Sequence, residues 1–191
     1  MKKILVFLFF VTFWKSSKAQ LIERISLAGS KESTALPFTR SLPIHPGGEI
    51  VLTFNEKKRE KSITSWNLGI GGFHHKKIAN AFYLKGEYHY RPIIKSTLTI
   101  DIIGNLGYMH TFYPGEVYEL NKHTGDFEKI TQYGRPHVLA GVGIGITYIK
   151  SENIHPFIRQ ELAIESPFAN GIPVMIHSFV KIGISYQLNS K

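Results

Sequence analysis

The clearest pattern in the chain is an alternation of apolar and polar residues near its C-terminal end. Positions 177–188 read HSFVKIGISYQL, in which the even positions from Val180 to Leu188 are apolar. The odd positions are polar or small, with Phe179 as the exception. Because successive side chains of a strand point to opposite faces, this period of two predicts a strand with one apolar face.

Other segments repeat the pattern, at residues 48–54, 63–73, 81–91, 96–112, 137–149 and 155–165. Segment 21–30 alternates less regularly and is the natural eighth strand, because single-chain bacterial barrels usually have an even number of strands. No internal apolar run approaches the length of a transmembrane helix, so a membrane-spanning chain would have to use strands. The fold class predicted is all-β, an antiparallel up-and-down transmembrane β-barrel of about eight strands.

The N-terminus has the pattern of an export signal. Two lysines precede an apolar run over residues 4–14, and small residues lead to Ala19. A run of this length is too short to span a bilayer and is typical of a secretory signal peptide. We therefore expect residues 1–19 to be a cleaved signal peptide and residues 20–191 to form one outer-membrane barrel domain. The absence of cysteine excludes disulfides, lipidation at cysteine and thiolate metal sites.

The segments between the predicted strands differ in length in a regular way. If both termini are periplasmic, the long segments 31–46 and 114–135 fall on the outer side, where such barrels carry long loops. Residues 118–130, around His123-Thr124-Gly125-Asp126, predict a protruding hairpin. Segments 56–61, 92–95 and 151–154 are predicted to be short periplasmic turns.

A soluble lipocalin-like barrel or β-sandwich is the alternative fold, with its apolar face inside and its polar face in water. The polar face here carries glycine at positions 141, 143 and 145. Regular glycines suit a narrow lumen, because they leave room for long side chains opposite. Aromatic residues near strand ends fit the interfacial girdles of membrane proteins. The expected location is therefore the cell outer membrane.

The end of the chain also resembles a known signal. Lys181, Gly183, Tyr186 and Leu188 resemble the C-terminal assembly signal of outer-membrane barrels, although residues 189–191 follow it. The strand series resembles the small outer-membrane β-barrel proteins common in Bacteroidota. This resemblance implies contact with outer-membrane lipid and lipopolysaccharide, and the barrel insertion machinery as a partner.

Charged residues on the predicted inner face are the main candidates for chemistry. They are Glu49, Lys85, Glu87, Arg91, Asp101, Arg159, Glu161 and Lys181. Because the interior of an eight-stranded barrel is filled by side chains and buried charges must pair, we expect a structural ion-pair network in the lumen. A gated proton or ion path is the alternative. With either the ion-pair network or the gated path, we expect no open pore.

Two groups of residues are candidates for contacts outside the barrel. The aromatic residues Phe112, Tyr113 and Tyr118 flank or lie in the long outer loop, and His74, His75, Lys76 and Lys77 form a basic tip. The tip could meet lipopolysaccharide phosphates. Adjacent histidines in a turn could share a metal, but no carboxylate lies nearby in sequence, so neither a metal nor a cofactor is expected.

The net charge and the spacing of possible catalytic residues indicate which classes of function to expect. Loss of the signal peptide removes four lysines and no acid, which leaves 19 basic and 14 acidic residues without a clustered basic face, so nucleic acid is not an expected partner. His177 and Ser178 are adjacent and would point to opposite faces, and no Gly-x-Ser-x-Gly motif occurs. We expect a non-enzymatic barrel that scaffolds or completes a larger outer-membrane protein complex. A lipid A-modifying enzyme remains the alternative.

Overall fold

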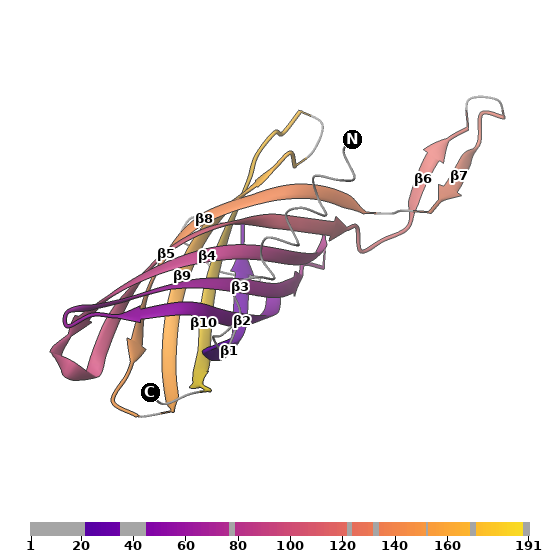
Figure 1. Ribbon diagram of the computed structural model, residues 1–191. Helices are drawn as coiled ribbons and strands as arrows, with labels where there is room; N and C mark the ends of the chain where they lie inside the picture. The colour runs from indigo at the N-terminus through magenta and orange to yellow at the C-terminus, as the bar shows by residue number, and fades with distance from the viewer. Residues whose placement is uncertain are drawn as a thin grey trace, which may run out of the picture.

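The chain folds into a closed antiparallel β-barrel. The computed structural model describes residues 22–34, 45–76, 79–121, 124–131, 134–151, 153–168 and 171–188. The barrel strands follow one another in the order β1-β10-β9-β8-β5-β4-β3-β2 (Figure 1). Each strand pairs with its neighbour in the barrel sequence, and β1 closes the barrel against β10. Among the described residues, no helix is both long enough and apolar enough to cross a membrane.

The barrel strands have these bounds: β1 Arg24–Ser33, β2 His45–Lys58, β3 Ser62–His74, β4 Asn80–Ile94, β5 Leu98–Phe112, β8 Arg135–Tyr148, β9 Ile154–Ser166 and β10 Met175–Gln187. A short 3-10 helix, η1, covers Lys95–Thr97 between β4 and β5. The predicted fold class and the strand predicted at 21–30 are thus confirmed, with β1 shifted by three residues.

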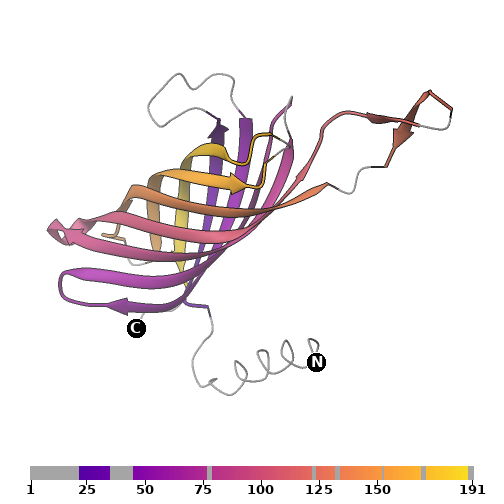
Figure 2. The same ribbon diagram turned by 90° about the horizontal axis from the view of Figure 1, so that it is seen from above.

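A separate hairpin of β6 (Val117–Leu120) and β7 (Phe127–Ile130) connects β5 to β8. We call this hairpin the arm. Figures 1 and 2 both show it standing clear of the barrel wall. The protruding hairpin predicted at 118–130 is confirmed.

Several strands run beyond the predicted segments. β2 begins at His45 and ends at Lys58, so it extends on both sides of the predicted segment 48–54. It passes through a β-bulge between Phe54 and Lys57, where Asn55 adopts a φ of 51°. A bulge adds a residue to one strand, which lets the ladder continue although the alternation is interrupted. The predicted turn 56–61 is therefore shorter than expected.

The outer wall of the barrel is apolar, and its inner face is polar. Leu106, Val142 and Ile182, on three different strands, are 63%, 63% and 64% exposed. A soluble protein would bury such residues, whereas a barrel in a membrane turns them toward lipid. The arrangement is the reverse of a lipocalin-like barrel, so the soluble alternative is wrong for this fold.

The two ends of the barrel differ. The terminal end holds the start of β1, the end of β10 and the short connections 59–61, 95–97 and 149–153. The loop end holds the end of β1 and the start of β2, the ends of β3, β5 and β9, and the starts of β4, β8 and β10, and the arm extends from it (Figure 2). The strand ends that are joined by the long segments thus lie together at one end, as the topology predicted.

Candidate functional site in the barrel lumen

Five charged side chains fill the middle of the lumen, and we call them the central cluster: Glu49, Lys85, Glu87, Glu161 and Lys181. The Nζ atom of Lys85 lies 3.0 Å from Glu49 Oε2, 2.8 Å from Glu87 Oε1 and 2.7 Å from Glu161 Oε2. The Nζ atom of Lys181 lies 2.6 Å from Glu49 Oε2 and 2.8 Å from Glu161 Oε2. All five side chains are buried. Each carboxylate therefore has an ammonium partner, as burial of charge requires.

Glycines on β8 make room for this cluster. Gly143 pairs with Glu161 and Gly145 pairs with Arg159 across the β8–β9 ladder. A Cβ atom at Gly143 would lie 2.7 Å from Glu161 Cγ, and one at Gly145 would lie 2.5 Å from Arg159 Cγ. The predicted role of the glycine stripe is confirmed, because long charged side chains of β9 lie flat against it.

The remaining predicted lumen charges lie toward the terminal end and form separate pairs. Arg159 donates from Nε to Asp101 Oδ2 at 2.7 Å. Arg91 and Arg24 donate to the two oxygens of Glu56, at 2.7 Å and 2.9 Å. The structure thus brings five of the eight predicted residues into one cluster and assigns the other three to pairs nearby.

Sequence reasoning missed Glu56, which it placed in a solvated turn. The odd positions Glu49, Val51 and Thr53 face the lumen, so strict alternation would turn Glu56 outward. The bulge between Phe54 and Lys57 inserts an unpaired residue, and this reverses the alternation beyond it. No signal in the pattern of apolar and polar residues marks the bulge.

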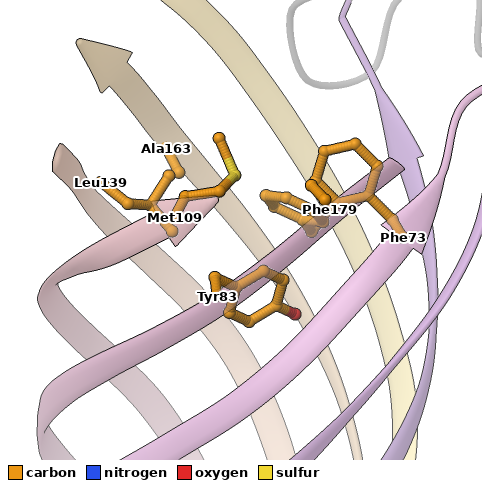
Figure 3. Close-up of a cluster of buried hydrophobic side chains, with 7 residues drawn as sticks. Phe73, Tyr83, Met109, Leu139, Ala163 and Phe179 are labelled. Carbon is orange, nitrogen blue, oxygen red and sulfur yellow. The ribbon is translucent and has the colours of Figure 1, made fainter. Parts of the chain in front are cut away.

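An apolar layer lies on the loop-end side of the central cluster. Its members, drawn in Figure 3, are Phe73, Ala81, Tyr83, Met109, Leu139, Ala163 and Phe179. The Tyr83 hydroxyl donates to Glu49 Oε2 at 2.8 Å, so the layer borders the central cluster. Phe179, the exception to the alternation of β10, belongs to this layer, and its ring packs against Phe73 with centroids 5.7 Å apart.

Beyond the apolar layer, a second polar group lies at the loop end. We call it the loop-end cluster: Glu32, His45, His75, His137, Glu165 and His177, all buried. Glu32 Oε2 lies 2.8 Å from His45 Nδ1, and Glu32 Oε1 lies 2.9 Å from His177 Nδ1. The ring of His177 also lies 5.5 Å from that of Phe73, which connects the cluster to the apolar layer.

His177 lies between two carboxylates. Its Nε2 atom lies 2.8 Å from Glu165 Oε2, while its Nδ1 atom lies 2.9 Å from Glu32 Oε1. Both ring nitrogens therefore face a carboxylate oxygen, an arrangement that suits a ring with hydrogen on both nitrogens. Glu165 Oε1 lies 2.9 Å from His137 Nδ1, which extends the cluster to β8.

His45 and His75 lie face to face at one side of this cluster. Their ring centroids are 3.5 Å apart with an angle of 31° between the ring planes. Burial lowers the pKa of His75, and the neighbouring His45 lowers it further. A neutral imidazole keeps a lone pair on one nitrogen, which is the form that binds a metal. One ligand atom from each of Glu32, His45 and His75 can be chosen so that all three lie within 4.8 Å of one another.

The second group of carboxylates that could hold a metal is Glu49, Glu87 and Glu161. The ammonium of Lys85 lies within 3.0 Å of an oxygen of each of them. A lysine therefore already supplies the positive charge at that position.

The residues predicted to make contacts outside the barrel differ in their exposure. Phe112, Tyr113 and Tyr118 are 44%, 53% and 51% exposed, and His74 and Lys76 are exposed as well. The prediction for His75 was wrong, because the chain after β3 turns inward and buries its ring against His45. Lys77 lies outside the described residues.

The positions of His177 and Ser178 follow the prediction. The imidazole of His177 lies in the lumen, whereas Ser178 accepts a hydrogen bond from Gln160 Nε2 at 2.7 Å on the opposite face of the sheet. Within the predicted assembly signal, Lys181 points into the lumen and Tyr186 is 48% exposed. Recognition of that segment during membrane insertion stays a prediction.

Comparison with known proteins gives the fold. No known family model matches the chain, and no curated protein matches it. Neisserial surface protein A (NspA) is similar in structure, with a TM-score of 0.58 and 11% sequence identity over 86% of this chain and 95% of that chain. The outer membrane enzyme PagL has a TM-score of 0.48 and 8% identity over 86% and 99% of the two chains. Ail, the attachment invasion locus protein of Yersinia pestis, has a TM-score of 0.46 and 11% identity over 89% and 100%. The likeness to NspA agrees with the fold, a closed eight-stranded β-barrel, and the apolar outer wall of this barrel agrees with the predicted location in the outer membrane.

Proposed function

We propose that the protein is a non-enzymatic accessory barrel of the outer membrane, which attaches to a larger outer-membrane protein through its arm. The observation that carries this proposal is the exposed apolar face of the arm. Leu120 lies directly opposite Phe127 in the β6–β7 ladder, and the two side chains are 53% and 72% exposed. Tyr118 lies on the same face, and it is 51% exposed. Large aromatic residues of this kind are typical anchors of protein interfaces.

The construction of the arm supports a role in binding. An isolated two-stranded hairpin is marginally stable in water, and this one stands clear of the barrel (Figure 1). A partner would cover its apolar face and pair with its free strand edges. At its base, Lys129 forms an ion pair with Glu116, and the Tyr118 hydroxyl donates to the same carboxylate at 2.6 Å. The Lys129 hydrogen bond lowers the pKa of Glu116, which favours the ionised form that these contacts need.

The rest of the barrel supports an anchoring role rather than a catalytic one. The central cluster and the apolar layer occupy the lumen with buried side chains. His177 lies inside while Ser178 lies on the outer wall, so these two residues do not form a nucleophile and base. The Bacteroidota type of the resemblance and the insertion machinery as a partner stay predictions.

Site-specific photo-crosslinking in native outer membranes tests the proposal. A crosslinker at Phe127 should capture one outer-membrane protein in a stoichiometric adduct, and a crosslinker at Ile182 on the lipid-facing wall should not. The same protein should copurify with the tagged chain in mild detergent. Its recovery should fall when Leu120 and Phe127 are both changed to serine, but not in Asp126→Ser, a polar position of the same arm.

Equal recovery of the partner with the altered arm would contradict the proposed attachment. The enzymatic alternative has its own measurement, the acyl pattern of lipid A in a strain that lacks the protein. A changed pattern that returns when the wild-type chain is expressed would favour a lipid A-modifying enzyme.

A further inference from the structure

The loop-end cluster contains a set of metal-binding groups that the anchoring role does not use. We propose that Glu32, His45 and His75 bind a divalent transition-metal ion of the Zn²⁺ class. The three residues come from the end of β1, the start of β2 and the turn after β3. The three residues are 0%, 6% and 7% exposed, so the proposed site is buried.

The ligand set fits a borderline-soft metal. Two imidazoles and one carboxylate are a common set of three protein ligands for zinc, and they leave a fourth position for water or another ligand. Imidazole nitrogens favour zinc and similar ions over Mg²⁺ and Ca²⁺, which prefer oxygen ligands. Because one ligand atom from each residue already lies within 4.8 Å of the other two, small side-chain rotations bring them to a single ion.

The contact between His45 and Glu32 already brings two ligand atoms together. The Nδ1 atom of His45 lies 2.8 Å from Glu32 Oε2, and an ion bound to both atoms would take the place of the hydrogen that they share. The ring of His75 is 3.5 Å away, centroid to centroid.

A second layer of contacts holds Glu32 in place. Its Oε1 atom lies 2.9 Å from His177 Nδ1, and His177 Nε2 in turn lies 2.8 Å from Glu165 Oε2. Such outer partners orient metal ligands and tune their basicity.

The central cluster shows why only one of the two carboxylate groups suits a metal. There Lys85 and Lys181 occupy the space between Glu49, Glu87 and Glu161. Lysine ammonium groups cannot be ligands, and they would repel a dication. At the loop end the cationic partners are histidines, which become ligands when they lose a proton.

Zinc titration of the full-length chain tests the site. The protein would be purified in detergent, stripped with a chelator and titrated with Zn²⁺ against a chromophoric competitor. Wild type should bind one Zn²⁺ per chain, with binding weakened more than about 100-fold in His45→Ala and in His75→Ala. His177→Gln, which removes an outer partner, should weaken it about 10- to 100-fold. His74→Ala is the matched control, because that neighbouring side chain is exposed and hydrogen-bonded to Asn80, and it should bind as wild type does.

Co²⁺ binding to wild type gives a readout that needs no variant. A four-coordinate site with nitrogen ligands should give intense visible absorption, which Zn²⁺ should abolish by displacement. Folding of each variant would be checked by its heat-dependent mobility in gel electrophoresis. Absence of stoichiometric Zn²⁺ binding by the folded wild type, or equal affinity in folded His45→Ala and His75→Ala, would overturn the proposal.

Discussion

The central cluster and the loop-end cluster are both groups of buried carboxylates in one lumen, but they balance their charge with different cations. The central cluster uses Lys85 and Lys181, whose ammonium groups lie 2.6–3.0 Å from carboxylate oxygens. The loop-end cluster uses histidines, with His177 between Glu32 and Glu165. Lysine stays charged at neutral pH, whereas histidine exchanges its proton there. In the central cluster, ammonium groups that cannot be metal ligands occupy the space between the carboxylates, whereas the partners in the loop-end cluster are imidazoles, which can bind a metal.

The apolar layer lies between the central cluster and the loop-end cluster. Phe73 and Phe179 pack edge to face between them, and Tyr83 lies beside Phe179 with ring centroids 6.1 Å apart. The ring of Phe179 lies beside both Lys181 and His177, but the ion pairs of these two residues are formed within their own clusters. Sites that do not share charged partners usually contribute nearly independently to stability. Changes in one cluster should therefore leave the properties of the other intact, and the following predictions test this separation.

The largest effect is expected from Lys181→Met, which removes one of the two central ammonium groups. Glu49 and Glu161 would then share Lys85 alone, and removal of one partner from a buried ion pair costs about 3–5 kcal/mol. The free energy of unfolding, measured by urea titration in lipid vesicles, should fall by that amount. The double variant Glu161→Gln/Lys181→Met should recover part of the loss. A Lys181→Met protein as stable as wild type would contradict a closed ion-pair network.

Zinc binding at the loop-end cluster should stabilise the folded protein, because the ion binds the folded state and not the unfolded one. At a free Zn²⁺ concentration 100 times the Kd, the free energy of unfolding should rise by about 2.7 kcal/mol. The same increase is expected in Lys181→Met, because the apolar layer separates the two clusters, and no increase is expected in His75→Ala. An increase of equal size in His75→Ala would place the metal elsewhere.

Gly143→Ala should have a smaller effect, confined to the central cluster. The new Cβ atom would lie 2.7 Å from Glu161 Cγ and 3.2 Å from the Gln160 carbonyl oxygen. Overpacking of this kind costs about 1–3 kcal/mol, and the same urea titration measures it. Gly104→Ala is the control, since a Cβ there meets no atom within 4 Å, and it should be close to neutral. Equal losses in both variants would point to glycine flexibility rather than to space for Glu161.

The smallest effect is expected from His74→Ala. His74 is exposed and contacts Asn80, and surface substitutions usually change stability by less than about 0.5 kcal/mol. Both the free energy of unfolding and the stabilisation by Zn²⁺ should stay at wild-type values. A loss of zinc stabilisation in this variant would extend the loop-end cluster to the barrel rim.

The alternation of apolar and polar residues predicted well which side chains of each strand face the lumen. The positions where this prediction failed have identifiable causes. Lys85 and Glu161 face inward as their positions predict. Glu56 was missed because a bulge reverses the alternation, and His75 was misplaced because its segment turns inward beyond the strand. In both cases the deviation lies where regular strand geometry stops, so a pattern with a period of two carries no information about it.

By itself the sequence determined the strands, the apolar outer wall and the identity of the lumen charges, because each depends on residues two positions apart. Only the tertiary structure decided which charges meet. Lys181 contacts Glu49 across 132 positions of the chain, and His177 contacts Glu32 across 145. These pairings depend on the register and closure of the barrel and on the reach of each side chain across the lumen. The division of the lumen into a closed lysine cluster and an open histidine cluster therefore emerges only when β10 pairs with β1.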